Sequence, residues 1–188
     1  LIGMAETAVA VAEVLAPYRD SLPIVLDPVM MAKGGYPLLA PDAIEAVRTR
    51  LMPVTFLVTP NLPEAAALLG EPVAESEAAV EHQGKRLLAM GCRAVLIKGG
   101  HGEGAESIDY LIAPQGTRAL AAPRVATKTT HGTGCSLSSA IAAGLAKGEG
   151  LETAVGNAKA WISAAISAAD RFSVGHGHGP IHHFHKFD

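Results

Sequence analysis

The stretch TFLVTPNLPEAAALLG, residues 55–70, joins the pattern of a β-strand directly to the pattern of a helix. Its first part is a short apolar run without charge, which is typical of a buried strand. Asn61 and Glu64 follow at the spacing of a helix capping box, and Gly70 provides a stop for the helix. The stretch therefore predicts a buried strand followed by a short helix, which is the repeating unit of an α/β fold.

The same alternation continues on both sides of this stretch. Apolar runs at 22–30 and 94–100 predict two more buried strands, and residues 107–125 predict a hairpin around Pro114–Gly116. Helix patterns cover 4–16, 41–53, 76–91, 134–146 and 151–169. Strands alternating with helices predict an α/β fold with a mostly parallel central sheet and helices on both faces, in three layers, as a single domain over residues 1–188.

The composition restricts the function classes. Net charge is -3 and no basic stripe occurs, which argues against a general nucleic-acid surface. No apolar run approaches the roughly 20 residues of a membrane span. The two cysteines form no CxxC pattern, which fits a reducing, cytoplasmic environment. The chain begins at Leu1 and enters an apolar run at once, so we expect that an N-terminal portion precedes it.

Polar residues stand where the predicted strands end. They are Asp27, Asn61 with Glu64, Lys98, and the loop Gly132–Cys135. In parallel sheets ligands bind at the carboxyl ends of the strands. We therefore expect these groups to gather around one ligand.

The loop before the fifth predicted helix has the features of an anion site. In TKTTHGTGCSLSSAIAAG, residues 127–144, Gly132 and Gly134 allow a sharp turn directly before a helix N-terminus. The hydroxyls of Thr130 and Thr133 add donors, and the helix dipole would favour the thiolate of Cys135. The alternative is a glycine turn with a small buried cysteine that packs the helix onto the sheet.

The other strand-end residues also have two interpretations. Asp27 could hold Mg²⁺ indirectly or accept a proton, or it could be a turn aspartate that bonds backbone N–H groups. Glu64 could reach a hydrated Mg²⁺, or it could only cap its helix together with Asn61. Lys98 could face a phosphate, or it could pair with a carboxylate.

Histidine is concentrated near the C-terminus. Metal binding is one interpretation, but no cysteine or acidic ligand stands nearby and the spacing fits no standard zinc pattern. We favour a polar segment that lies over the domain. The histidines are His176, His178, His182, His183 and His185.

Five segments together resemble the hydroxymethylpyrimidine/phosphomethylpyrimidine kinases of thiamine biosynthesis, which have a ribokinase-like fold. The resemblance runs in order through essentially the whole chain, and Cys135 in GTGC points to the pyrimidine branch of that fold. The segments are LDPVMMAKGG, TPNLPEAAALLG, LIKGGH, THGTGCSLSSAIAAGLAKG and GHGPIHHFH.

The resemblance implies an enzyme that uses ATP and Mg²⁺, and relatives of this kind commonly form homodimers. Gly132, Thr133 and Gly134 would form the anion hole for the transferring phosphoryl group, with Cys135 as the base beside the substrate hydroxyl.

Further roles follow from the same resemblance. Asp27 would lie near the metal and the phosphates. Asn61 and Glu64 would form the family's N-x-x-E motif at the Mg²⁺ site. Lys98 would face the nucleotide phosphates, and we expect the hydroxyl of Thr130 to contribute to the same cofactor site.

Two departures from the family pattern stand out. Thr129 stands where many relatives have asparagine, and the glycine-rich GSDSGGGAG-type segment that forms much of the pyrimidine pocket is not in this sequence. The alternatives are a pyridoxal kinase of the same fold, a non-catalytic nucleotide-binding fragment, and a structural partner domain.

Overall fold

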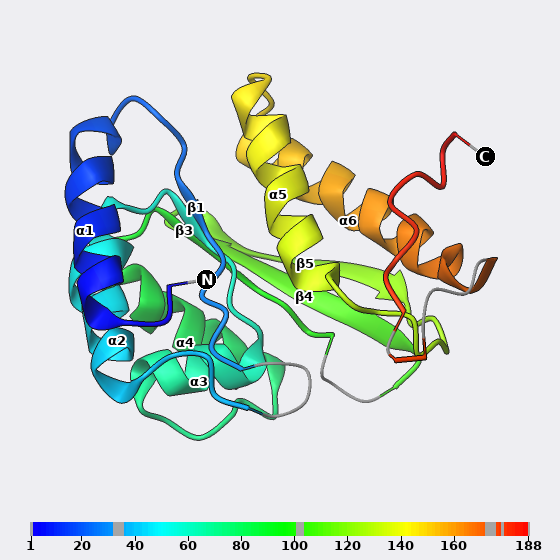
Figure 1. Ribbon diagram of the computed structural model, residues 1–188, viewed down its shortest axis with the longest axis horizontal. Coiled ribbons are helices and arrows are strands. Elements are labelled where there is room, and N and C mark those ends of the chain that lie inside the picture. Colours follow the sequence, from blue (N-terminus) through cyan, green and yellow to red (C-terminus); the bar gives the residue numbers. More distant parts are fainter. Residues whose placement is uncertain (1, 32–35, 101–103, 172–175, 178, 188) are drawn as a thin grey trace. The chain divides into compact units, whose positions relative to one another are not determined.

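The structure is a computed structural model that describes residues 2–31, 36–100, 104–171, 176–177 and 179–187. The chain divides into two compact units (Figure 1). The first unit contains Leu1–Gly102 and Ile108–Ala119, and the second contains Glu103–Ser107 and Leu120–Asp188. The single domain expected over residues 1–188 stays a prediction.

Strands and helices follow the predicted order along the chain. The first part of the chain contains α1 (Ala5–Leu15), β1 (Val25–Leu26), α2 (Pro41–Ala46), β2 (Leu57–Val58), α3 (Leu62–Leu69), α4 (Glu77–Leu88) and β3 (Ala94–Ile97). The hairpin consists of β4 (Glu106–Ala113) and β5 (Gly116–Pro123), and α5 (Thr133–Ala146) and α6 (Leu151–Ser167) follow it. Short 3-10 turns lie at Ala16–Tyr18, Met52–Val54 and Ala169–Arg171.

The sheet is mixed, with strand order β1-β2-β3-β4-β5. β1, β2 and β3 are parallel, with Leu26 opposite Val58 and Val58 opposite Val95. β3 and β4 are antiparallel, with Leu96 opposite Leu111. The mostly parallel sheet is thus confirmed for the first three strands, and the predicted hairpin supplies the antiparallel part. Because β1, β2 and β3 run in the same direction, their carboxyl ends lie at one edge.

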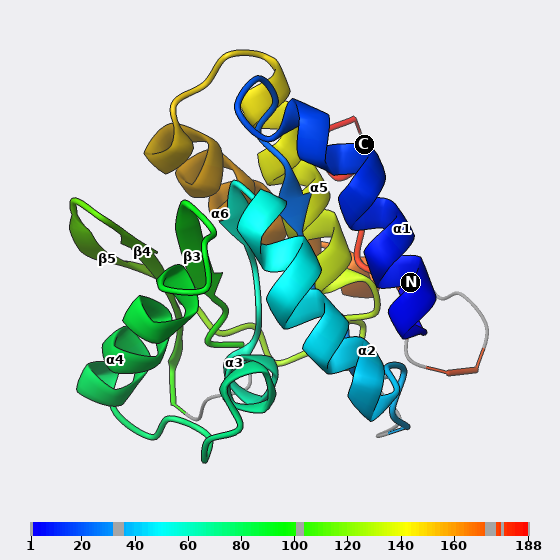
Figure 2. The same ribbon diagram turned by 90° about the vertical axis from the view of Figure 1, so that its left-hand side faces the viewer.

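Helices α1 to α4 pack on one face of these strands (Figure 2). Their small and aliphatic side chains join alternate strand residues in one buried cluster, as expected for amphipathic helices on a sheet. The cluster includes Ala8 and Ala12 of α1, Ala43 and Ala46 of α2, Ala65 and Leu68 of α3, Val80 and Leu87 of α4, and Val58, Val95 and Ile97 of the strands.

One predicted helix differs in kind from the observed one. The pattern over 41–53 predicts a single helix, but α2 gives way to a π-helical turn at Val47–Leu51 and then to a 3-10 turn at Met52–Val54. Pro53 has no N–H to donate, so the α-helical ladder cannot continue through it. The Thr55 hydroxyl donates to the Leu51 carbonyl at 2.8 Å and thereby satisfies that acceptor.

The second unit contains the helix pair α5 and α6. The two helices pack closely where Gly144 faces Ala154, since a Cβ on Gly144 would lie 3.1 Å from the Ala154 Cβ. Helix α5 begins at Thr133, one residue before the predicted start, and α6 ends at Ser167, two residues before the predicted end.

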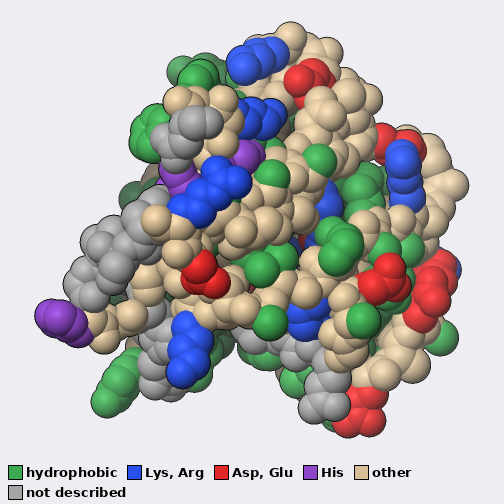
Figure 3. Space-filling model, turned by 90° about the vertical axis from the view of Figure 1, so that its right-hand side faces the viewer, with side chains coloured by type: hydrophobic (Ala, Val, Ile, Leu, Met, Phe, Trp, Pro, Cys, Tyr) green, Lys and Arg blue, Asp and Glu red, His purple; other side chains and the backbone are tan. Residues whose placement is uncertain are grey.

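Within the part of the chain that the structure describes, no helix is both long enough and apolar enough to cross a membrane. On the face shown in Figure 3, acidic and basic side chains are interspersed among apolar ones, without a continuous basic stripe on the visible described residues.

Candidate active site

The ends of the three parallel strands carry the predicted site residues of the first unit. Asp27 follows β1, Asn61 lies three residues beyond β2, and Lys98 follows β3. A parallel bridge joins Asn61 and Lys98, and the Lys98 N–H donates to the Pro60 carbonyl at 2.8 Å. The sheet therefore brings these three residues to one edge, as the sequence predicts.

Asp27 and Lys98 form an ion pair at this edge. Lys98 Nζ lies 2.7 Å from Asp27 Oδ1, and the Thr59 hydroxyl donates to the same oxygen at 3.2 Å. The two charged side chains are only 12% and 13% exposed. Lys98 therefore pairs with a carboxylate, the alternative considered for this residue, although a phosphate could still replace that partner.

The second oxygen of Asp27 is buried and has no hydrogen-bond partner among the described residues. An unpaired buried carboxylate oxygen is unfavourable, because it has lost the water that solvates it. Among the described residues, this oxygen is thus left available to accept a further bond. A cation or a cation-bound water is the chemical partner that a carboxylate oxygen accepts best.

Asn61 and Glu64 form the predicted capping box of α3. Glu64 N–H donates to Asn61 Oδ1, and Asn61 N–H donates to Glu64 Oε2, both at 2.8 Å. The box uses one oxygen of each side chain. Glu64 is 5% exposed, so its carboxylate is held inside the protein rather than in solvent.

Burial raises the pKa of Glu64 above its ordinary value of 4.5. The positive charge of Lys98 and the backbone hydrogen bonds from Asn61 and Met30 lower this pKa, and the negative charge of Asp27 raises it. The effect of burial on the pKa is larger than that of the groups that stabilise the ionised carboxylate, so the pKa is raised. The carboxyl group of Glu64 is therefore protonated more easily than a solvent-exposed one, and a bound cation would favour its ionised form.

The carboxylates fit a magnesium ion shared with phosphate better than an all-protein metal site. In the described ranges, no three His, Cys, Asp or Glu side chains come together to hold a metal. Mg²⁺ typically keeps several waters and binds one or two carboxylates together with substrate phosphates. Asp27 and Glu64 match that donor set.

Sequence reasoning missed Asp109, which holds the turn after Lys98. The Gly99 N–H donates to Asp109 Oδ1 at 2.8 Å, and Asp109 is 4% exposed. Gly99 also lies so close to the Ile108 carbonyl oxygen that a Cβ would overlap it. Asp109 lies within the apolar pattern of the hairpin, where a lone acid gives no signal of such a role.

In the second unit, the glycine turn leads into α5 as predicted. Gly132 is the residue before the helix and has a left-handed backbone with φ of 83°, a conformation that favours glycine. Thr133 Oγ1 donates to the Thr130 carbonyl at 2.8 Å, which closes the turn. The first N–H groups of a helix have no acceptor within it, so Gly134 and its neighbours can present donors to an anion.

Cys135 lies in the first turn of α5 and is exposed. The alternative of a small buried cysteine that packs the helix is therefore wrong. A cysteine at this position is open to a ligand or reagent.

A second residue that sequence reasoning missed ties down the segment before the turn. The hydroxyls of Thr127 and Thr129 donate to Asp170 Oδ1 at 2.6 Å and 2.8 Å. These bonds lower the pKa of Asp170 below its ordinary value of 3.8. Thr129, which departs from the family pattern, is thus an anchor of the loop.

The structure brings together Asp27, Asn61, Glu64 and Lys98 in the first unit. Thr130, Gly132, Thr133, Gly134 and Cys135 form one turn in the second unit. The meeting of the two groups around one ligand stays a prediction. Of the C-terminal histidines, His178 lies outside the described residues.

Comparison with known proteins gives a family match over most of the chain. The family model described as phosphomethylpyrimidine kinase matches residues 1–182. The hydroxymethylpyrimidine/phosphomethylpyrimidine kinase of Salmonella typhimurium is 56% identical over 164 residues, which cover 87% of this chain and 62% of that protein. The protein of the same description from Escherichia coli is 52% identical, over 99% of this chain and 71% of its own length.

Among solved structures, the pyridoxal kinase of Bacillus subtilis in complex with ADP has a TM-score of 0.88 at 30% identity. The match covers 97% of this chain and 68% of that one. The chain thus spans about two thirds of the length of the proteins that it resembles. The ribokinase-like fold class expected from the sequence is confirmed by this likeness.

Proposed function

Because the chain belongs to the phosphomethylpyrimidine kinase family, we propose that it transfers phosphoryl groups from ATP to 4-amino-5-hydroxymethyl-2-methylpyrimidine and to its monophosphate in thiamine biosynthesis. The observation that carries the proposal is the buried carboxylate of Asp27. One of its oxygens is bonded by Lys98, and the other has no partner among the described residues. A carboxylate oxygen beside an ammonium suits a site that would bind a cation and a phosphate together.

Phosphoryl transfer depends mainly on positioning and on stabilisation of charge. Asp27 and Glu64 would hold Mg²⁺, which shields the phosphate oxygens when it is bound. Lys98 is held by Asp27 at the end of β3, so its ammonium is already desolvated and oriented. Lys98 would donate to a phosphate oxygen of the bound nucleotide, and Asp27 would then face the metal site.

Asn61 contributes indirectly on this proposal. Its capping bonds fix the Glu64 backbone and one Glu64 oxygen, and this holds the carboxylate in one orientation. Ordered carboxylates of this kind lower the entropic cost of binding.

The Gly132–Gly134 turn and the first N–H groups of α5 would receive the transferring phosphoryl group, and Thr130 and Thr133 would line its approach. The thiolate of Cys135 would accept the proton of the substrate hydroxyl as the substrate oxygen attacks phosphorus and ADP leaves. An exposed thiol in the first turn of a helix supports this role.

An assay of ADP release tests the proposal. The chain is incubated with ATP and Mg²⁺ and with the hydroxymethylpyrimidine, its monophosphate or pyridoxal in turn. We expect turnover with the two pyrimidines and a much smaller rate with pyridoxal. ATP binding in calorimetry without turnover on any substrate would instead identify a non-catalytic nucleotide-binding fragment.

The role of Cys135 needs its own variant. Cys135→Ala should lower kcat by about 10²-fold, the lower end of what a general base contributes. A Cys135→Ala variant with near-normal turnover would refute the role of Cys135 as the general base, but it would leave the kinase assignment intact.

Pyridoxal kinase is the second candidate, and one observation favours it. The solved pyridoxal kinase of Bacillus subtilis has closely similar backbone geometry, at 30% identity. The 56% and 52% identities to hydroxymethylpyrimidine/phosphomethylpyrimidine kinases outweigh this likeness. The pyridoxal arm of the same assay separates the two substrates.

A further inference from the structure

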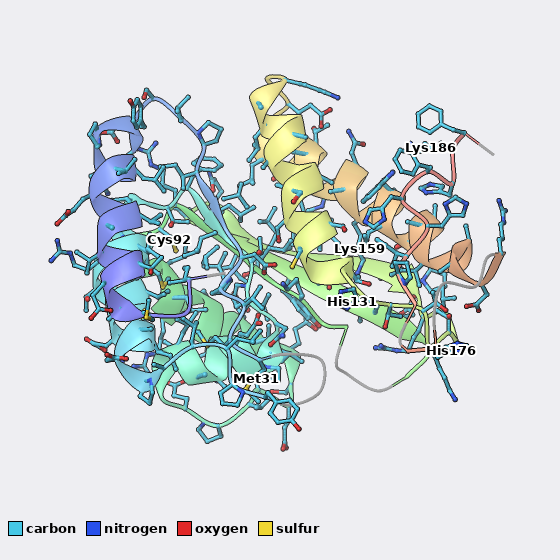
Figure 4. All side chains as sticks on the ribbon, viewed as in Figure 1. Met31, Cys92, His131, Lys159, His176 and Lys186 are labelled. Atoms are coloured by element: carbon cyan, nitrogen blue, oxygen red, sulfur yellow. The ribbon has the colours of Figure 1, made fainter. Side chains whose placement is uncertain are left out.

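Near the C-terminus, the segment 179–185, here called the tail segment, pairs with the residue that precedes the glycine turn. The His131 N–H donates to the Gly179 carbonyl at 3.1 Å, and the Ile181 N–H donates back to the His131 carbonyl at 3.4 Å. These bonds form a parallel bridge between His131 and Pro180. Figure 4 labels His131 below the start of α5, and Figure 1 shows the red C-terminal segment running beside α6.

The tail segment is anchored in the second unit rather than lying loosely on it. Ile181 is 1% exposed and His182 is 6% exposed, so both side chains are buried. The His182 N–H donates to the Ala165 carbonyl of α6 at 3.1 Å. Gly179 fits against Thr129 only because it has no side chain, since its Cβ would lie 2.7 Å from the Thr129 methyl carbon.

His183 connects the tail segment to α5. His183 Nε2 lies 2.9 Å from the Ser136 hydroxyl oxygen, and the Ser136 N–H donates to the Gly132 carbonyl at 2.9 Å. Only Ser136 thus separates the imidazole from the turn. The Trp161 ring holds His183 in place, because their ring centroids are 6.2 Å apart, and the His185 ring lies 6.1 Å from Trp161.

A glycine turn needs such support to act as an anion site. Gly132 adopts a left-handed backbone. Because glycine has no Cβ, it can also adopt many other backbone conformations, so the residue alone does not fix the turn. Donors that stabilise a transition state are effective only if they are already oriented before the reaction. The tail segment provides a fixed backbone partner on one side of the turn and a side-chain partner on the other.

We propose that His183 is a positioning residue for phosphoryl transfer, which acts through Ser136 to hold the Gly132 turn in the conformation that receives the transferring group. This inference rests on the proposed kinase function. Neither His183 nor Ser136 needs to touch substrate, and the main-chain pairing at His131 places the tail segment so that the imidazole reaches Ser136.

A double-mutant cycle with rescue tests the proposal in the full chain. His183→Phe keeps an aromatic ring beside Trp161 but removes the bond to Ser136, and Ser136→Ala removes the same bond from the other side. His183→Gln restores a polar group near the position of Nε2. Phe184→Ala is the matched control, because Phe184 is the next residue of the tail segment and is 70% exposed.

We expect each single variant to lower kcat about tenfold, with the KM for ATP changed less than about twofold, because the turn acts on the transition state. The double variant should be no slower than either single variant, since both remove one interaction. His183→Gln should regain most of the rate, and Phe184→Ala should match wild type. Additive losses, or no rescue by glutamine, would overturn the proposal.

Two further readouts do not depend on activity. Amide hydrogen exchange of residues 131–136 should be about two- to tenfold faster in His183→Phe, which is the range expected for one lost hydrogen bond. Trp161 is the one tryptophan of the chain, so its fluorescence reports whether the tail segment remains seated in each variant. If exchange at the turn is unchanged while kcat falls, the positioning role is wrong.

These readouts separate the inference from the proposed function. If the wild-type chain releases no ADP with any substrate, the kinase assignment fails. The exchange rates of 131–136 then still decide whether His183 holds the turn: acceleration in His183→Phe and Ser136→Ala alike supports the contact, and no change in either refutes it.

Discussion

Lys98 Nζ lies 2.7 Å from Asp27 Oδ1, although their strands, β3 and β1, are separated in the sheet by β2. The pair therefore spans the end of β2, where the Thr59 hydroxyl also donates to Asp27 Oδ1. Both side chains are largely desolvated. Each charged group therefore needs the opposite charge of the other, because too little water surrounds it to solvate the charge.

Lys98→Met should lower the free energy of unfolding by about 3 kcal/mol, because it leaves the Asp27 carboxylate charged and largely buried. Lys85→Met is the matched control. It removes an exposed ion pair to Glu81, whose side chains are 65% and 38% exposed, and should cost less than about 1 kcal/mol. Urea unfolding measures both. Equal stability of the two variants would contradict the burial argument.

Glu64→Gln should leave the helix cap intact, because the glutamine carbonyl can accept the Asn61 N–H. The raised pKa of Glu64 means that wild type loses stability relative to Glu64→Gln as the pH rises from 4.5 through that raised pKa. Without metal, the variant should therefore be at least as stable as wild type near neutral pH.

Addition of ATP and Mg²⁺ should make wild type more stable than Glu64→Gln, which reverses their order of stability without ligand. A ligand that binds the native state stabilises it by an amount that grows with the logarithm of its affinity, and the variant lacks a charged metal partner. Thermal melts with and without the ligands measure this. A glutamine variant that gains as much from Mg²⁺ and ATP as wild type would remove Glu64 from the metal site.

The two thiols should differ sharply in reactivity. Burial raises the pKa of Cys92 to about 12, so this thiol is neutral and inaccessible in the native protein. Cys135 is exposed. A thiol reagent near neutral pH should label one cysteine in the native state and both after denaturation, and Cys135→Ser should abolish the native reaction. Rapid native labelling of Cys92 would show that its environment opens readily.

The two glycines after Lys98 should respond differently to alanine. Gly99→Ala should destabilise the fold by about 3 kcal/mol or more, because its Cβ would overlap the Ile108 carbonyl oxygen and force the backbone apart. Among the described residues, no atom lies within 4 Å of a Cβ placed on Gly100, so Gly100→Ala should be close to neutral. Thermal unfolding compares them, and a tolerated Gly99→Ala would mean that the hairpin can move away from this turn.

The contribution of Asp170 to the stability of the fold should depend on pH. Hydrogen bonds from Thr127 and Thr129 lower its pKa below 3.8, so the stabilisation is complete above that pH and is lost as the pH falls through the lowered pKa. Asp170→Ala should therefore be less stable than wild type near neutral pH and approach it in acid. A difference that stays constant with pH would assign the effect to packing rather than to charge.

Much of the fold could be predicted from local patterns. The capping box at Asn61 and Glu64 and the stop at Gly70 mark α3 by chemistry within a few residues of chain, and the structure has each of them. The Glu81–Lys85 pair on α4 follows from helical periodicity in the same way and lies at 2.8 Å. The π-helical turn at Val47–Leu51 could not be predicted, because the pattern gives no sign of how a helix adjusts before Pro53.

Residues whose role depends on distant contacts could not be recognised in the same way. Asp109 bonds Gly99, Asp170 bonds Thr127 and His183 contacts Ser136, and these partners are 10, 43 and 47 residues away in sequence. Side chains of their kind are common in strands, helix ends and polar tails, so their local context does not distinguish them.

The sequence by itself determined the alternation of strands and helices, the capped helix and the glycine turn, because periodicity, capping and backbone freedom act over only a few residues. Only the tertiary structure decided that Lys98 pairs with Asp27, that Cys135 is exposed, and that the tail segment reaches Ser136. Those outcomes depend on which strand ends and segments become neighbours, and burial then sets the cost of every unpaired charge.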